Sequence, residues 1–180
     1  MIASPESVLA FWREAGPDKW FKKDTAFDEA IRARFLETYE AAAVGALSSW
    51  EQTAEGALAL TIVLDQFPRN MFRGDARAYA ADPLARAVAE RALARGFDTS
   101  MELSDRQFFY LPFEHSETIA DQERCCALFS ATGDADLLKW AQLHADIIRR
   151  FGRFPHRNAV LGRSTTADEQ AFLDGGGFKG

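Results

Sequence analysis

The stretch "ALALTIVLDQF" occupies positions 57–67 and runs directly into "PRNMFRG" at 68–74. No alternation of period two passes through it, and its Ala- and Leu-rich composition favours a helix over a strand. We expect this helix to begin near Thr53 and to end before Pro68, because a proline disfavours the helical conformation of the residue that precedes it.

Two charged residues share the apolar face of this predicted helix. Asp65 and Arg69 continue the line of Leu58 and Ile62 at helical spacing, which places a carboxylate on the side expected to be buried. Asp65 also lies in the last turn, where the helix dipole disfavours an acidic group by about 0.3 to 1 kcal/mol. We therefore predict that Asp65 and Arg69 form a structural ion pair.

Helix boundary signals extend from this segment toward both ends of the chain. Ser4 before Pro5 opens a helix that Gly16 closes, and Asp134 and Gly152 bound a long one. Strand signals are missing throughout. The fold is therefore predicted to be all-α, with about eight helices in antiparallel pairs.

Two further boundaries come from capping patterns near the third quarter and the end of the chain. Ser104 with Gln107 forms a predicted capping box before "FFYLPF", and Pro112 is expected to break that helix. Thr165 with Asp168 is expected to cap the last short helix.

Length, composition and charge limit the class of protein. A chain of 180 residues with 47% hydrophobic residues predicts a single domain over residues 1–174, followed by a flexible glycine-rich tail at 175–180. The net charge of -6 and the absence of basic blocks exclude general nucleic-acid binding as an expectation. No leader or membrane-spanning pattern occurs, so we expect a cytoplasmic protein without membrane partners.

Two distant stretches echo each other: "QFPRNMFRG" at 66–74 and "RFPHRNAVLGR" at 153–163. Several guanidinium groups in one place would suit a carboxylate or phosphate ligand. We predict that the two stretches form an anion pocket near His115, with histidine and Glu117 available for acid–base chemistry. The predicted catalytic residues are His115, His156 and Glu117, and the predicted ligand-binding residues are Arg69, Asn70, Arg73, Arg153, Arg157, Asn158 and Arg163.

A structural interpretation of the echo stands beside this one. Proline ends a helix, asparagine adopts a left-handed conformation, and arginine side chains cover the last carbonyl groups. On that interpretation the arginine, histidine and asparagine residues only hold helix ends in place.

Three motifs, "LDQFPRNMFRG", "FFYLPFEHSE" and "RFGRFPHRNAVLGRST", resemble a bacterial family known as domain of unknown function 924. The resemblance runs from about Val8 to Leu173. It implies a TPR-like stack of antiparallel helix pairs, and it implies no activity, cofactor or catalytic residue. The motif residues it singles out are Asp65, Gln66, Arg69, Asn70, Arg73, Gly74, His115, Ser116, Glu117, Arg153, His156, Arg157, Asn158, Gly162 and Arg163.

Two other kinds of function follow from these observations. A TPR-like stack would bind a protein or peptide partner, and Trp12, Trp20, Phe21 and Trp50 are candidates for an exposed aromatic patch. A metal site is not expected, because the histidines lack i, i+3 or i, i+4 spacing. We expect no cofactor, and the predicted partner is a small anionic molecule or, alternatively, a protein or peptide.

Overall fold

The computed structural model describes residues 1–178, which form nine α-helices and four short 3-10 helices and contain no β-strand. Eight of the α-helices have more than four residues, so the predicted all-α fold of about eight helices is confirmed. The chain divides into two compact units. Unit 1 comprises Met1–Arg73 and Arg77–Pro112, and unit 2 comprises Gly74–Ala76 and the chain from Phe113 onward. The predicted domain over residues 1–174 stays a prediction.

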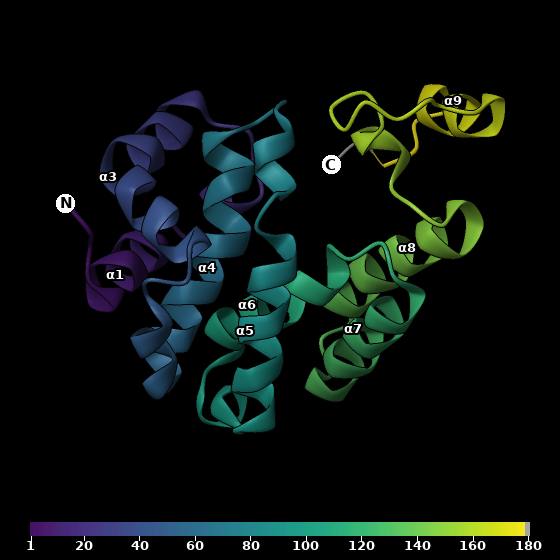
Figure 1. Ribbon diagram of the computed structural model, residues 1–180. Coiled ribbons are helices and arrows are strands. Elements are labelled where there is room, and N and C mark those ends of the chain that lie inside the picture. Colours follow the sequence, from purple (N-terminus) through teal and green to yellow (C-terminus); the bar gives the residue numbers. More distant parts are fainter. Residues whose placement is uncertain (179–180) are drawn as a thin grey trace. The chain divides into compact units, whose positions relative to one another are not determined.

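Unit 1 is organised around the central helix α4, which packs against α1, α3 and α5 (Figure 1). Nearly every residue of α4 is buried, which explains why Thr61 is the only polar residue between Ala57 and Leu64. The unit holds α1 (Pro5–Ala15), α2 (Pro17–Trp20), α3 (Thr25–Ala43), η1 (Ser48–Gln52), α4 (Ala54–Met71), most of η2 (Ala76–Tyr79), α5 (Asp82–Ala94), η3 (Phe97–Ser100) and α6 (Leu103–Glu114) up to Pro112.

Two helices continue through prolines that were predicted to end them. α4 extends past Pro68 to Met71, and α6 extends past Pro112 to Glu114. Both prolines are buried, and each lies within four residues of the end of its helix, so the hydrogen bond that it removes is one of the last in the helix. Burial of the flanking apolar side chains therefore outweighs the local preference of proline.

An aromatic cluster forms the core of unit 1. The Trp12 ring lies 5.8 Å from that of Trp20, 5.7 Å from that of Phe67 and 5.6 Å from that of Phe108, centroid to centroid. Trp12 and Trp20 are therefore core residues, and of the aromatic residues proposed for an exposed patch only Phe21 is largely exposed.

Unit 2 contains α7 (Ile119–Thr132), α8 (Ala135–Phe151), η4 (Pro155–Arg157) and α9 (Ala167–Asp174). α7 and α8 lie side by side as a pair joined by a two-residue turn (Figure 1). In that turn Gly133 adopts a left-handed conformation, with φ of 78°, and the Asp134 side chain caps α8.

Two capping predictions near the ends of helices are wrong by a small margin. α9 is capped by Thr166 and Glu169, which form a capping box, rather than by Thr165 and Asp168. α6 begins at Leu103, one residue before Ser104, so the predicted cap lies inside its first turn. Adjacent residues of similar type compete for a cap, and tertiary contacts select among them.

The described part of the predicted tail contacts the rest of unit 2. The Gly177 N–H donates to the Phe172 carbonyl over 2.9 Å, and the Phe178 ring lies 4.5 Å from that of His144 and 5.2 Å from that of His156. The remaining tail positions, 179 and 180, lie outside the described residues.

Candidate functional site

The first motif ends α4 with an arginine held between two carboxylates. The Arg69 guanidinium donates to both Asp82 oxygens over 2.9 and 3.0 Å and lies 3.4 Å from an Asp65 oxygen. It also donates to the Asp65 carbonyl over 2.7 Å. Burial alone would lower the pKa of Arg69, but the Asp65 and Asp82 charges outweigh burial and raise that pKa. Arg69 is therefore a permanent cation facing two anions.

The other polar residues of the first motif reach back to α3. Asn70 donates to Asp28 over 2.8 Å, and the Arg73 guanidinium donates to both Asp28 oxygens over 2.9 and 3.0 Å. The end of α4 is thus tied to the start of α3 through a single carboxylate.

The second motif supplies an acidic partner to the third motif. Glu117, in the link between α6 and α7, accepts two hydrogen bonds from Arg163 over 2.7 and 3.0 Å and one from the Phe154 N–H over 2.8 Å. Burial alone would raise the pKa of Glu117, but Arg163 and the Phe154 N–H hold that pKa below its usual range. His115 is half-buried at the end of α6, two residues before this carboxylate.

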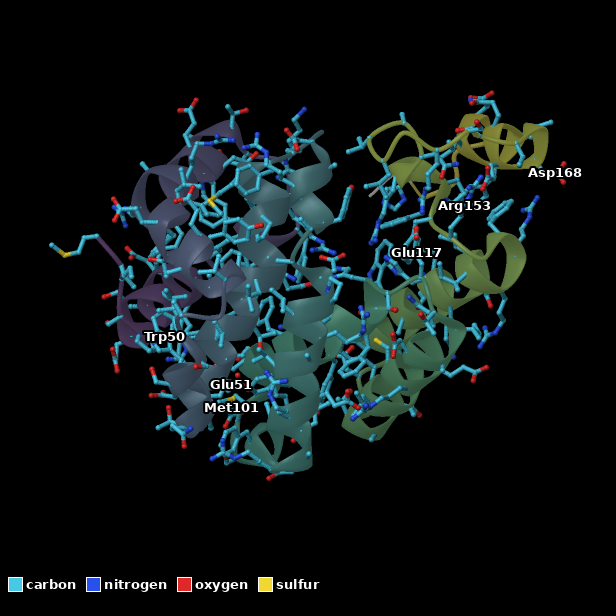
Figure 2. All side chains as sticks on the ribbon, viewed as in Figure 1. Trp50, Glu51, Met101, Glu117, Arg153 and Asp168 are labelled. Atoms are coloured by element: carbon cyan, nitrogen blue, oxygen red, sulfur yellow. The ribbon has the colours of Figure 1, made fainter. Side chains whose placement is uncertain are left out.

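The third motif is held at its other end by α9. The Arg153 guanidinium donates to both Glu169 oxygens over 2.6 and 2.9 Å, and Asn158 donates to Glu169 over 3.2 Å. The Arg153 partner, together with the Thr166 backbone, lowers the pKa of Glu169 to about 2, against the opposing effect of burial. In Figure 2 Arg153 lies beneath α9, whereas the exposed Asp168 points outward from the same helix.

The two remaining residues of the third motif lie against aromatic rings. The Arg157 side chain is buried, and its guanidinium lies 4.5 Å above the centre of the Phe154 ring. The His156 ring lies 5.6 Å from the Phe154 ring and 5.2 Å from the Phe178 ring. His144 contacts the same two phenylalanines, so both histidines belong to one aromatic cluster.

Four arginines of the echoing stretches therefore share one arrangement. Each grips a carboxylate of its own unit with two nitrogens, which is the strongest neutralising geometry available to a guanidinium. The pairs are Arg69 with Asp82, Arg73 with Asp28, Arg153 with Glu169, and Arg163 with Glu117. An incoming anion would have to compete with these carboxylates, so the contacts favour a structural role for the four arginines. The left-handed asparagine of the structural interpretation is wrong, because no residue other than glycine has a positive φ among residues 1–178.

A different part of unit 2 combines cations with an apolar surface. A groove of about 500 Å³ lies along α8 beside the chain segment that follows α9. We call it the α8 groove; its lining includes Lys139, Leu143, Asp146, Ile147, Arg150, Phe151, Phe172 and Phe178. Lys139, Leu143, Ile147 and Arg150 recur at spacings of 4, 4 and 3 along the helix, so they form one stripe.

The charges in the α8 groove are not balanced in the way the motif arginines are. Asp146 pairs with Arg149 over 2.8 Å. Lys139 and Arg150 have no carboxylate partner among residues 1–178, and the Arg150 guanidinium instead lies 4.6 Å above the Phe151 ring and 5.8 Å above the Phe172 ring. Two cations are therefore available beside apolar side chains.

A second hollow, of about 410 Å³ in unit 1, contains no such available cations, because its arginines already have partners. Arg91 faces Glu51 over 2.7 and 2.9 Å, and Arg95 donates to the carbonyl groups of Glu51 and Gln52. Its arginines are occupied in the same way as those of the echoing motifs.

The sequence predicted neither the α8 groove nor three of the four carboxylate partners. The partners Asp28, Asp82 and Glu169 lie outside the quoted motifs, and only the fold brings them to the arginines. The stripe of Lys139, Leu143, Ile147 and Arg150 carries a helical period that could have indicated the groove. Within the described part of the chain, no group of three or more His, Cys, Asp or Glu residues is arranged to hold a metal ion.

Comparisons with known proteins place these features in a family. A family model described as "Bacterial protein of unknown function (DUF924)" matches residues 8–177. A solved structure of a protein of unknown function from Agrobacterium tumefaciens is 49% identical, with a TM-score of 0.92, over 95% of this chain and 97% of that chain. A comparison with curated proteins finds no match. Because the model spans nearly all of the sequence, this chain belongs to the bacterial DUF924 family of proteins of unknown function.

Proposed function

We propose that this protein binds a small anionic molecule, and that it does so in the α8 groove rather than at the arginines of the echoing motifs. The observation that carries the proposal is the pair of cations, Lys139 and Arg150, that line the groove without a carboxylate partner among the described residues. The volume of about 500 Å³ lies within the range of about 300 to 1,000 Å³ that is typical of small-molecule sites.

The contacts of the echoing motifs support the choice of site. For an incoming anion, displacing a carboxylate that is bound to arginine through two hydrogen bonds costs more free energy than binding to a cation that faces solvent. The acid–base role predicted for His115, His156 and Glu117 stays a prediction of the sequence and is not needed for binding. The cytoplasmic location predicted from the sequence is retained within the proposal; within the described residues, no helix combines the length and apolar character that a membrane crossing requires.

The experiment is a thermal-shift and calorimetric screen with phosphate, sulfate, acetate and benzoate at an ionic strength matched with chloride. An anion at 100 times its dissociation constant should stabilise the protein by about 2.7 kcal/mol. The double variant Lys139→Ala with Arg150→Ala should lose the response. Its matched control is Lys23→Ala with Arg34→Ala in unit 1, which removes the same charge and also removes an arginine that stacks on a ring, Phe11.

The two double variants separate the outcomes. A response lost only in the α8 variant supports the proposed site. A response equal in both variants would refute the site, and no response of the wild-type protein to any of the four anions would refute the function.

A helical protein-interaction surface is the second candidate, and one observation favours it. Trp140 on α8 is 53% exposed, and tryptophan is among the residues that dominate binding energy at protein interfaces. If this surface acts in self-association, Trp140→Ala should shift the sedimentation profile of concentrated protein toward the monomer. An unchanged sedimentation profile would show that Trp140 does not take part in self-association.

A further inference from the structure

The two cations of the α8 groove lie far apart along the helix. Lys139 and Arg150 are eleven residues apart, which corresponds to about 16 Å at the helical rise of about 1.5 Å per residue. A compact anion such as phosphate cannot contact both. Multiple charged contacts are therefore not available to a compact anion in this groove.

The surface between the two cations is largely apolar, although Gln142 and Asp146 also line it. Leu143 follows Lys139 by about one helical turn and Ile147 by about two, and Phe151 and Phe172 lie at the end where Arg150 is found. Phe151 and Phe172 are themselves in contact, with ring centroids 5.2 Å apart. A ligand that extends from Lys139 along the groove would therefore exchange water for the half-buried side chains of Leu143, Phe151 and Phe172, whereas Ile147 is only 5% exposed and offers little surface.

The two cations are not equivalent. Arg150 is already placed over two aromatic rings and lies in the last turn of α8, where the helix dipole favours a cation and disfavours an incoming anion. Lys139 lies outside that turn and is exposed. The ammonium of Lys139 is thus the better contact for an acidic headgroup.

We infer that the α8 groove binds amphiphilic carboxylates, with the acidic headgroup at Lys139 and an alkyl or aryl body lying over Leu143 toward Phe151 and Phe172. This inference rests on the proposed function and names the class of ligand for the same site. The apolar body supplies most of the affinity, and the single headgroup contact fixes its direction.

The test is a chain-length series, acetate, butanoate, hexanoate and octanoate, titrated calorimetrically against the protein, with octanoate kept below its micelle concentration. Each added methylene that becomes buried should tighten binding about fourfold, which corresponds to about 0.8 kcal/mol. Octanol is the uncharged control and should bind more weakly than octanoate. Lys139→Ala should weaken octanoate binding more than Arg150→Ala does.

A second variant tests the apolar surface. Leu143→Ser should flatten the dependence of affinity on chain length, and Leu173→Ser on α9, which does not line the groove, is its control. Circular dichroism of each variant verifies that the helices are retained. A flat slope in Leu143→Ser but not in Leu173→Ser supports the inference.

The remaining outcomes distinguish this inference from the function on which it rests. If acetate and octanoate bind equally and both require Lys139, the amphiphile inference is overturned and anion binding stands. If octanol binds as tightly as octanoate, or if no member of the series binds, both are overturned.

Discussion

Replacing Arg69 by alanine should destabilise unit 1 more than any exposed arginine substitution. The Asp65 side chain is 1% exposed and the Arg69 side chain 20% exposed, so removal of the guanidinium leaves a buried carboxylate without this cation. Breaking a buried ion pair from one side costs about 3 to 5 kcal/mol, because the remaining carboxylate stays desolvated after it loses this cation. We expect a loss of that size in the free energy of unfolding.

Arg91→Ala is a matched control within the same unit. Arg91 grips Glu51 over 2.7 and 2.9 Å, a geometry close to that of Arg69 with Asp82, but its side chain is 56% exposed. Exposed pairs contribute about 0 to 1 kcal/mol. Because the hydrogen-bond geometry is similar in both pairs, the difference in lost unfolding free energy between the two variants measures the effect of burial.

The assay is urea unfolding followed by tryptophan fluorescence, with circular dichroism as the second probe. Trp12, Trp20 and Trp50 report on unit 1, and the replacement of Trp140 by phenylalanine in every variant removes the signal of unit 2. A loss below about 1 kcal/mol for Arg69→Ala, or equal losses for the two variants, would refute the buried network as a source of stability.

Two further predictions concern unit 2, and both are read from the Trp140 signal, taken as the difference between the urea unfolding curves recorded with Trp140 and with Trp140→Phe. Because the pKa of Glu169 is lowered from 4.5 to about 2, its contribution to the free energy of unfolding is complete above pH 4.5 and is lost as the pH falls toward 2. Glu169→Gln should remove this part of the pH dependence of stability, whereas Asp168→Asn, at the exposed neighbouring residue, should keep it. Phe178→Ala should destabilise unit 2 by about 1 to 2 kcal/mol, because the ring is only half-buried against His144 and a fully buried ring would cost about 3 to 5 kcal/mol. An unchanged midpoint of urea unfolding would show that the chain from residue 175 behaves as the flexible tail predicted from the sequence.

The helices could be predicted because their signals are local. Ser4 with Pro5, Gly133, Asp134 and Gly152 mark helix ends through backbone conformations and caps that involve only a few neighbouring residues. The errors arose where a local preference met burial. Pro68 and Pro112 are tolerated inside helices because apolar side chains on both sides of each proline are packed into a core.

The sequence by itself determined that the chain is helical, where most helices begin and end, and that Asp65 and Arg69 share a buried face. Only the tertiary structure decided what the arginines of the two echoing stretches do, because Asp28, Asp82, Glu117 and Glu169 are between 13 and 46 positions away from the arginines they grip. Coulomb interaction depends on distance in space and not on separation along the chain. The α8 groove likewise depends on the tertiary structure, because the chain from Phe172 to Phe178 forms one of its walls beside α8.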